Sequence, residues 1–250
     1  MSVDDSPRID PVAYAYEGKD DPLLMLASKD ARPPTQADRA YQALEALYAS
    51  GSLAGGSLVS ESELAKLIAL GRTPVREAIK RMEIDGLLIP IHRKGFVVRE
   101  ISIREYMYLL EVREPVETAL FRAAAVRAAD HHRERLHECA GMFLIARRDR
   151  NRTLVLRADY EYKLVCLDAA ANPFMQNQLR SLQALARRFW NAHTSYEKRA
   201  YAMDEVTGFH LRIIEALISA DHVAAENNTH TFFSFLREFA AGLAAQQVQI

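Results

Sequence analysis

Two short amphipathic helices joined by a tight turn form the clearest hydrophobic pattern of the chain, between Ser60 and Gly86. The first helix is predicted to begin after Ser60, because Glu63 three residues later completes a capping box with it. The second is predicted to begin with Thr73 as N-cap and Pro74 as first helical residue, and to end at Gly86. The apolar positions recur every three or four residues, which predicts one buried face on each helix. They are Leu64, Leu67 and Ile68, then Val75, Ala78, Ile79 and Met82.

The other face of the second helix is basic. Arg72, Arg76 and Lys80 recur at four-residue intervals, so they project together and away from the buried face. A helix-turn-helix places its second helix in the major groove of DNA, where arginine suits both phosphates and guanine edges. These three cations are therefore candidate DNA contacts.

A short hairpin is predicted directly after the second helix. Two apolar runs, residues 87–91 and 96–98, flank a basic turn made of His92, Arg93, Lys94 and Gly95. The tip of such a wing would lie along the phosphates or reach into the minor groove. The charges alone fit an ordinary solvated helix about equally well, but the ordered motif followed by a wing favours DNA binding.

The rest of the chain is predicted to be helical. Residues 37–50 form the first helix of the DNA-binding domain, and beyond Arg99 six helical patterns follow without strand signals. Those six are predicted over residues 103–129, 131–148, 151–171, 174–195, 203–219 and 221–246. The expected fold class is mainly α: a winged helix-turn-helix domain with a small β-hairpin wing over residues 35–100, then an antiparallel all-α bundle over 101–250. Residues 1–34, rich in proline and aspartate, are expected to form a disordered or loosely docked arm.

Composition adds three restrictions. The formal net charge of the 250 residues is −1, so the argument for nucleic-acid binding rests on the local patch from Arg72 to Lys94. This segment contains six Lys or Arg and three acidic residues. The two cysteines, Cys139 and Cys166, have no metal-finger spacing, and the N-terminus has no signal pattern. Because no apolar run approaches the roughly 18 residues of a membrane span, a cytoplasmic protein without membrane contact is expected.

The N-terminal motif resembles the winged-helix domain of GntR-family bacterial transcription regulators. The matching residues are Gly51-x-Leu53, Gly56-x-Leu58, Ser60-Glu61, Leu64-Ala65, the string Arg72-Thr73-Pro74-Val75-Arg76-Glu77-Ala78, Gly86-Leu87-Leu88 and Arg93-Lys94-Gly95. The family usually has Leu-Gly-Val-Ser before the arginine, whereas this chain has Ile68-Ala69-Leu70-Gly71. The resemblance implies that Arg72, Thr73 and Arg76 contact DNA, assisted by residues 92–95 of the wing.

The C-terminal half resembles the FCD effector-binding domain of the FadR-like branch, in its shorter VanR-like variant with six helices. The matching residues are Glu111-Val112-Arg113, Asp159-x-x-Tyr162, Ala169-Ala170-Ala171-Asn172-Pro173, His210 with Ala216 and Asp221, and His230. In most such domains an Asp, a His four residues later and two further His residues hold a divalent metal, zinc, nickel or manganese. The corresponding positions here are Asp159, Lys163, His210 and His230.

Lys163 stands where the resemblance implies a histidine, and an ammonium has no lone pair for a metal. Three outcomes are open. Lys163 replaces the charge of the metal and pairs with Asp159 and an anionic effector, so that no metal is bound. Alternatively, a metal binds through Asp159, His210 and His230, with Lys163 turned away or His193 recruited. In the third outcome the two histidines are hydrogen-bonded core residues.

Two further groups belong to this half. Arg113 matches an arginine that often faces the same cavity in the family, where it would bind a carboxylate. The alternative is a salt bridge to a neighbouring Glu. Asp130, His131 and His132 resemble a metal pair only superficially, because adjacent helical residues point about 100° apart. A helix start is the better interpretation.

The leading hypothesis is a ligand-responsive transcription regulator, not an enzyme. A homodimer would bind a palindromic double-stranded DNA operator, more often as a repressor, and a small organic acid would release or rearrange it. One alternative is a metal-dependent hydrolytic enzyme using Asp159, His210 and His230. Another is a DNA-binding module with an inert dimerisation bundle. The leading hypothesis expects the guanidinium groups of Arg72 and Arg76 to be unpaired within the subunit when DNA is absent.

Overall fold

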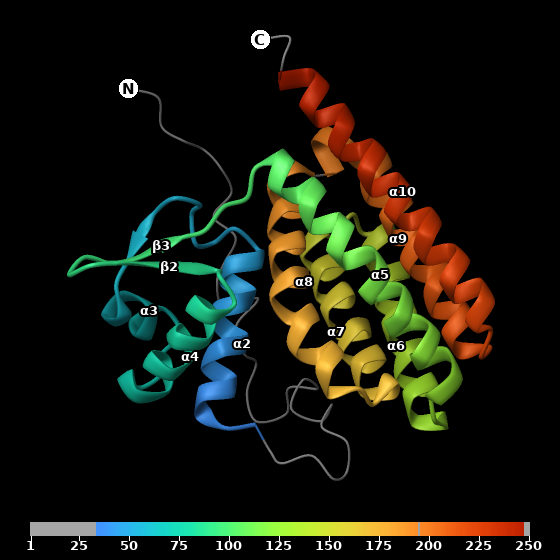
Figure 1. The fold of residues 1–250 in the computed structure, drawn as a ribbon, viewed down its shortest axis with the longest axis horizontal. Helices are drawn as coiled ribbons and strands as arrows, with labels where there is room; N and C mark the ends of the chain where they lie inside the picture. Colours follow the sequence, from blue (N-terminus) through green and yellow to red (C-terminus); the bar gives the residue numbers. More distant parts are fainter. Residues whose placement is uncertain (1–33, 195, 248–250) are drawn as a thin grey trace. The chain divides into compact units, whose positions relative to one another are not determined.

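The computed structural model describes residues 34–194 and 196–247, and the chain separates into two compact units, Met1–Arg99 and Glu100–Ile250. The expectation of a disordered arm over residues 1–34 therefore lies, except for Pro34, outside the described residues. Among the described residues, the first unit holds three helices and a small sheet, and the second holds only helices (Figure 1). The predicted fold class, a winged helix-turn-helix followed by an all-helical domain, is confirmed.

The first unit is built on α2 (Gln36–Ala49), α3 (Glu61–Leu67) and α4 (Arg72–Ile84). Capping boxes fix the first two starts, Thr35 with Asp38 for α2 and Ser60 with Glu63 for α3. Val75, Ala78, Ile79 and Met82 of α4 are buried, as predicted, and α4 packs on α2. The buried face of α2 contributes Tyr41, Leu44, Leu47 and Tyr48.

Two details of the helix-turn-helix differ from the sequence prediction. Helix α4 begins at Arg72 with Gly71 as N-cap, not at Pro74 after Thr73. The chain turns earlier than expected because Ala69 takes a left-handed conformation, with φ of 52°, just after α3 ends. Pro74 still lies in the first turn, where its missing N–H removes no helical hydrogen bond. Leu67 is 44% exposed, and Ala65 takes its place beside Leu64 in the core.

The wing is part of a three-stranded antiparallel sheet. The hairpin strands β2 (Leu88–Ile91) and β3 (Gly95–Val98) pair as predicted, with Ile91 opposite Gly95. The sequence prediction missed β1 (Leu58–Val59), which pairs with the other edge of β3 and gives the order β1-β3-β2. This pairing anchors the hairpin next to the start of α3, since Ser60 follows β1 directly.

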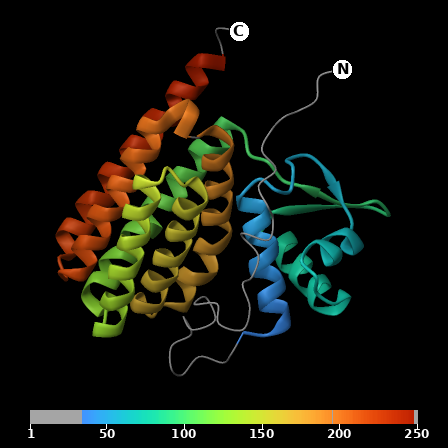
Figure 2. The same cartoon turned by 180° about the vertical axis from the view of Figure 1, so that it is seen from behind.

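The second unit consists of six helices in its described residues, as predicted. They are α5 (Ile103–Arg127), α6 (Asp130–Arg148), α7 (Arg152–Ala170), α8 (Pro173–His193), α9 (Tyr196–Ile218) and α10 (His222–Gln247). Helix α5 packs against α7, α8, α9 and α10, and α6 packs against α7 and α9. Figure 2 shows from behind how α10 (red) runs alongside α5 (green). Helix α9 begins seven residues earlier than predicted and contains a kink at Arg199 (φ −148°, ψ 51°).

None of the helices within residues 34–194 and 196–247 is long and apolar enough to span a lipid bilayer.

Candidate nucleic-acid interface and effector site

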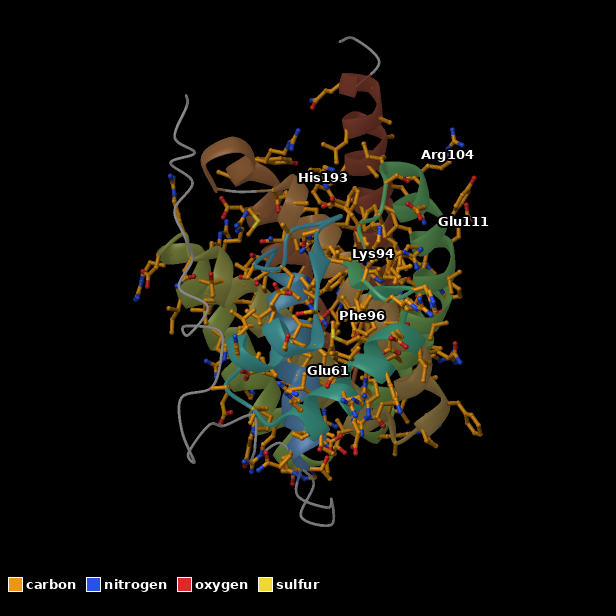
Figure 3. All side chains as sticks on the ribbon, turned by 90° about the vertical axis from the view of Figure 1, so that its left-hand side faces the viewer. Glu61, Lys94, Phe96, Arg104, Glu111 and His193 are labelled. Carbon is orange, nitrogen blue, oxygen red and sulfur yellow. The ribbon has the colours of Figure 1, made fainter. Side chains whose placement is uncertain are left out.

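The exposed face of α4 carries the cations that the sequence predicted. Arg72, Thr73, Arg76 and Lys80 are all exposed, as are His92, Arg93 and Lys94 at the turn of the wing. The side chains of Arg72, Lys80, Arg93 and Lys94 make no hydrogen bond or ion pair with any residue that the structure describes. Figure 3 looks onto this unit and labels Lys94 and Phe96 of the wing and Glu61 at the start of α3. The face therefore presents exposed positive charge, as phosphate binding requires.

Arg76 does not meet the expectation of an unpaired guanidinium. Its Nε donates to Oε2 of Glu61 at 3.0 Å and its Nη2 donates to Oε1 at 2.9 Å. The Arg76 side chain is nevertheless 62% exposed. Exposed ion pairs are weak because water and salt screen them, so a phosphate can replace Glu61 as partner. The pairing corrects the expectation about Arg76 without removing the residue from the DNA-facing surface.

The orientation of α4 is fixed from its other side. Arg81 Nη1 lies 2.6 Å from Oδ1 of Asp38, and the Tyr41 hydroxyl donates to Oδ2 of Asp85 at 2.5 Å, so two polar contacts join α4 to α2. Burial alone would raise the pKa of Asp38, but hydrogen bonds from Arg81 and Thr35 outweigh it and lower the pKa to about 2. Arg81 is thus used within the fold, and the exposed patch has one cation fewer than the sequence count.

The backbone geometry at Gly95 requires a glycine, independently of any contact that the wing makes with DNA. Its φ is +113°, and a Cβ atom added there would lie 2.4 Å from the carbonyl oxygen of Val59. Only glycine allows β1 to approach β3 this closely. Arg93, two residues before Gly95, also has a positive φ of 58°, which turns the hairpin at its basic tip.

The second candidate site is a small cavity of about 40 Å³ inside the helical unit. Helices α5, α7, α8, α9 and α10 all contribute to its walls. The polar side chains that line it are Tyr106, Arg113, Asp159, Lys163, Arg187 and His210, and the larger apolar ones are Val155, Leu156, Trp190, Val206, Phe232 and Leu236. Four of the five candidate effector residues from the sequence, Arg113, Asp159, Lys163 and His210, thus meet at one place.

Asp159 is the centre of a buried ionic network. Its Oδ1 lies 3.3 Å from Nζ of Lys163 and 3.4 Å from Nε2 of His210, and its Oδ2 lies 3.6 Å from Nη1 of Arg187. Lys163 also lies 3.4 Å from Oε2 of Glu117, whose other oxygen accepts a hydrogen bond from Nε of Arg113 at 2.8 Å. Arg113 therefore both lines the cavity and pairs with a neighbouring Glu, so the two alternatives for it coexist.

The charges of this network decide the protonation states inside it. Burial raises the pKa of Asp159, but Lys163, His210 and Arg187 outweigh this effect and hold that pKa well below its ordinary value. Burial lowers the pKa of His210 to about 4, with Asp159 acting in the opposite direction. His210 is therefore neutral at pH 7, and the Tyr162 hydroxyl lies 3.1 Å from its Nδ1. With that hydroxyl as donor, Nε2 carries the hydrogen and faces Asp159.

His230 is not part of the cavity, contrary to the sequence prediction. Its side chain is 51% exposed, and its Nδ1 lies 2.9 Å from Oε1 of Glu114, which also pairs with Arg237. The buried stripe of α10 passes through Thr229, Phe232 and Leu236. One residue after Thr229, a side chain points about 100° away from that stripe. Phe232 faces the cavity instead, with its ring centroid 5.0 Å from that of His210.

The metal implied by the resemblance does not fit this cavity. An ammonium 3.3 Å from the Asp159 carboxylate lies inside the space that a metal on that oxygen would need, and like charges repel. The imidazole expected from α10 is replaced by the apolar ring of Phe232. Of the remaining carboxylates, Glu117 is held by Arg113 and Lys163. Asp159 and His210 alone make a poor metal site.

A different group of metal-ligand atoms lies on the surface, within 4.8 Å of one another: His131, His132 and Asp168. Both nitrogens of His132 are already engaged, Nδ1 as acceptor for the backbone N–H of Ala129 at 3.0 Å and Nε2 at 3.1 Å from Asp168. This supports the interpretation of the segment as a helix start, although Ala129 and not Asp130 is the N-cap of α6.

The sequence interpretation missed three members of the network, Glu117, Arg187 and Tyr106. Glu117 follows Arg113 by four residues, the spacing of a helical ion pair, so its partnership with Arg113 was visible in the sequence. Arg187 lies on α8, which carried no motif, and only the packing of α8 against α5 and α7 brings it close to Asp159. Tyr106 lies two helical turns before Arg113 on α5, and burial raises its pKa to about 12.

Comparison with known proteins supports the family resemblance of both halves of the molecule. Residues 36–98 match the profile described as bacterial regulatory proteins, gntR family, and residues 108–234 match the FCD domain. The HTH-type transcriptional regulator YdhC of Bacillus subtilis is 22% identical over 78% of this chain and 86% of its own length. The structure of Escherichia coli McbR/YncC has the same fold, with a TM-score of 0.72 and 14% identity over 84% of this chain and 99% of that one. This chain belongs to the GntR family of bacterial transcription regulators and carries an FCD domain.

Proposed function

We propose that this protein is a ligand-responsive repressor that binds a palindromic operator as a homodimer in the cytoplasm. A small organic acid would bind in the cavity of the helical unit and release or rearrange the protein on DNA. The observation that carries the proposal is the pairing of two sites in one chain: a basic, exposed α4 and wing, and a buried cationic cavity lined by five helices of a different unit.

The contacts of the DNA-binding unit support an assignment of roles. Arg72, Thr73, Arg76 and Lys80 would meet the major groove, and His92, Arg93 and Lys94 would follow the phosphates or the minor groove, with Gly95 shaping the wing. A twofold dimer would present two α4 helices to successive major grooves of a palindrome. A repressor role is supported by a relative from Paenarthrobacter nicotinovorans named "Probable D-xylose utilization operon transcriptional repressor", which is 26% identical over 75% of this chain.

The effector part rests on Arg113, Asp159, Lys163 and His210. A carboxylate is the functional group that buried guanidinium and ammonium groups bind best, through charge-assisted hydrogen bonds. Binding would change DNA affinity by favouring one of two arrangements of the helices that line the cavity. His230 is left out of this assignment because it lies at the surface with Glu114.

The two alternatives receive less support. The matched domains and relatives are transcription regulators, which are not enzymes. A hydrolytic site would need a metal-bound water, and Lys163 occupies the space beside Asp159 where that metal would sit. An inert bundle would be at least as stable with apolar residues in place of these buried ion pairs, because the desolvation penalty of buried charges often exceeds the gain from pairing.

The proposal is tested by fluorescence anisotropy with a DNA fragment from upstream of the protein's own coding region. Arg72→Ala and Lys80→Ala are expected to weaken binding about tenfold each. Arg148→Ala, which removes an exposed arginine of the helical unit with a 73% exposed side chain, is the matched control and should leave binding unchanged. Equal affinity for all four proteins would contradict the assignment of α4, and a monomer in analytical ultracentrifugation at the DNA-binding concentration would contradict the dimer.

A further inference from the structure

We infer that the FCD domain of this protein works without a metal, with Lys163 as its internal cation, and that its cavity takes a monocarboxylate with an apolar body. The inference rests on the proposed effector function and deepens it by naming the chemical class of the ligand. Its support comes from the position of Lys163, the two carboxylates that already surround it and the apolar side chains that line the rest of the cavity.

Lys163 occupies the centre of the site and is held there. Its side chain is 3% exposed, and its ammonium lies between two carboxylates, Asp159 at 3.3 Å and Glu117 at 3.4 Å. Asp159 and Lys163 are four residues apart on α7, so both side chains project from one face of the helix toward the cavity. An ammonium between two carboxylates does electrostatically what a bound cation would do, and it leaves no space for one.

Two carboxylates, Asp159 and Glu117, already lie beside Lys163, where they pair with Arg113, Lys163 and Arg187. One carboxylate of a ligand can share these cations. A second carboxylate would add buried negative charge beside Asp159 and Glu117 or would face the apolar side chains of the cavity, and either is costly. Hydroxy acids and polycarboxylates chelate metals well, but in a cavity without a metal this property does not strengthen their binding.

The remaining wall of the cavity is apolar. Trp190, Val206, Phe232 and Leu236 line it on α8, α9 and α10, and Val155 and Leu156 extend it on α7. Phe232 in particular offers a ring surface, where an imidazole would have offered a hydrogen bond or a metal ligand. A ligand with its carboxylate toward Lys163 and Arg113 and a hydrocarbon body toward Phe232 and Trp190 satisfies both ends of the cavity.

The cavity must expand to take such a ligand. A volume of about 40 Å³ suits a few water molecules, whereas sites for organic ligands measure roughly 300 Å³ or more. Because α5, α7, α8, α9 and α10 all line it, a ligand that opens the cavity must move these helices relative to one another. That coupling gives the ligand a differential affinity for two states of the unit.

The experiment uses the full-length protein and four probe acids: benzoate, hexanoate, succinate and citrate. Binding is measured by isothermal titration calorimetry and by the thermal shift, each with and without EDTA. We expect benzoate or hexanoate to bind and raise the unfolding temperature, EDTA to change neither result, and succinate and citrate to bind at least about tenfold more weakly. Elemental analysis should find well under one metal per chain. Binding that requires a metal, or that favours succinate or citrate, or the absence of binding by both apolar acids, would overturn the inference.

Variants locate the binding site. Lys163→Met keeps the length of the side chain, removes its charge and should weaken benzoate or hexanoate binding at least about tenfold. Lys163→Arg keeps the positive charge, so it should bind the acid more tightly than Lys163→Met. This variant shows whether the loss of binding in Lys163→Met comes from the missing charge or from misfolding. Arg148→Ala should bind like the wild type. Equal binding by Lys163→Met and the wild type would contradict the role of Lys163.

Failure of this inference is distinguishable from failure of the proposed function. If an apolar monocarboxylate binds but leaves DNA affinity unchanged, the inference stands and the effector role fails. If instead DNA is released only by an acid that needs a metal, the effector role stands and the inference fails.

Discussion

The guanidinium of Arg76 on α4 donates two hydrogen bonds to the carboxylate of Glu61 at the start of α3. The hydrogen bonds from Arg76 are also the main reason that the pKa of Glu61 is lowered. In the protein without DNA, one carboxylate thus pairs with an arginine of α4 and offsets part of its charge. Glu61 is therefore placed to control how strongly Arg76 attracts phosphate.

Glu61→Gln is expected to increase binding to non-specific DNA several-fold, because it frees the charge of Arg76 while keeping the side-chain shape. The slope of log Kd against log salt concentration should steepen by about 1, the equivalent of one more phosphate contact. Anisotropy with a random-sequence duplex at four salt concentrations measures it. Glu63→Gln, two residues after Glu61, is the control for the loss of one negative charge on α3, because Gln can also complete the capping box with Ser60. An unchanged slope for Glu61→Gln would show that freeing Arg76 adds no phosphate contact.

Gly95→Ala is expected to destabilise the DNA-binding unit by about 2 kcal/mol or more, since the new Cβ would overlap the Val59 carbonyl at an unfavourable φ. Gly56→Ala is the matched control, because Gly56 has φ of +72° but has nothing within 4 Å of its added Cβ. It should cost only the backbone strain, about 1 kcal/mol. Urea unfolding followed by circular dichroism measures both, and equal losses would show that the contact with β1 is unimportant.

Acid is expected to destabilise the helical unit between about pH 6.5 and pH 4. The pKa of His210 falls from 6.5 to about 4 in the folded protein, so within this window the unfolded chain binds a proton that the folded one does not. Stability is complete above pH 6.5 and decreases as pH falls, by on the order of 3 kcal/mol in total. His210→Gln should flatten the curve of unfolding free energy against pH in this window. A wild-type curve that is already flat there would contradict the neutral, buried state of His210.

Lys163→His is expected to create a metal site from Asp159, the new imidazole and His210. An Asp and a His four residues apart on α7 would face one point, together with the His210 imidazole that already lies 3.4 Å from Asp159. About one zinc or nickel ion per chain should appear in elemental analysis after dialysis. Adding Phe232→His should tighten the binding further, because Phe232 is the residue of α10 that faces the cavity.

Lys163→Met is the control for the metal prediction, since it removes the ammonium without adding a ligand. It should bind no more metal than the wild type. Metal bound equally by both Lys163 variants would show that repulsion by the ammonium, and not the missing ligand, keeps a metal out.

Much of this protein follows from local sequence. The capping box of Ser60 and Glu63, the buried stripe from Val75 to Met82 and the left-handed Gly86 each depend on residues within one or two turns, and all three occur as predicted. The six helices of the second unit follow in the same way from apolar spacing and from stop signals such as Asn172-Pro173. Asp159 and Lys163 face the same cavity because four residues on a helix always return to one face.

Only the tertiary structure determined the contacts between segments that are separated in the sequence. Three examples are the pairing of β1 with β3, the approach of Arg187 on α8 to Asp159, and the ion pair between Arg76 and Glu61 across the turn. The rotation of α10 about its axis places Phe232 in the cavity and His230 on the surface. This orientation follows because Thr229, Phe232 and Leu236 form the buried face of the helix. Helix formation is governed by neighbours along the chain, whereas the direction in which each helix faces is set by the total apolar area that packing removes from water.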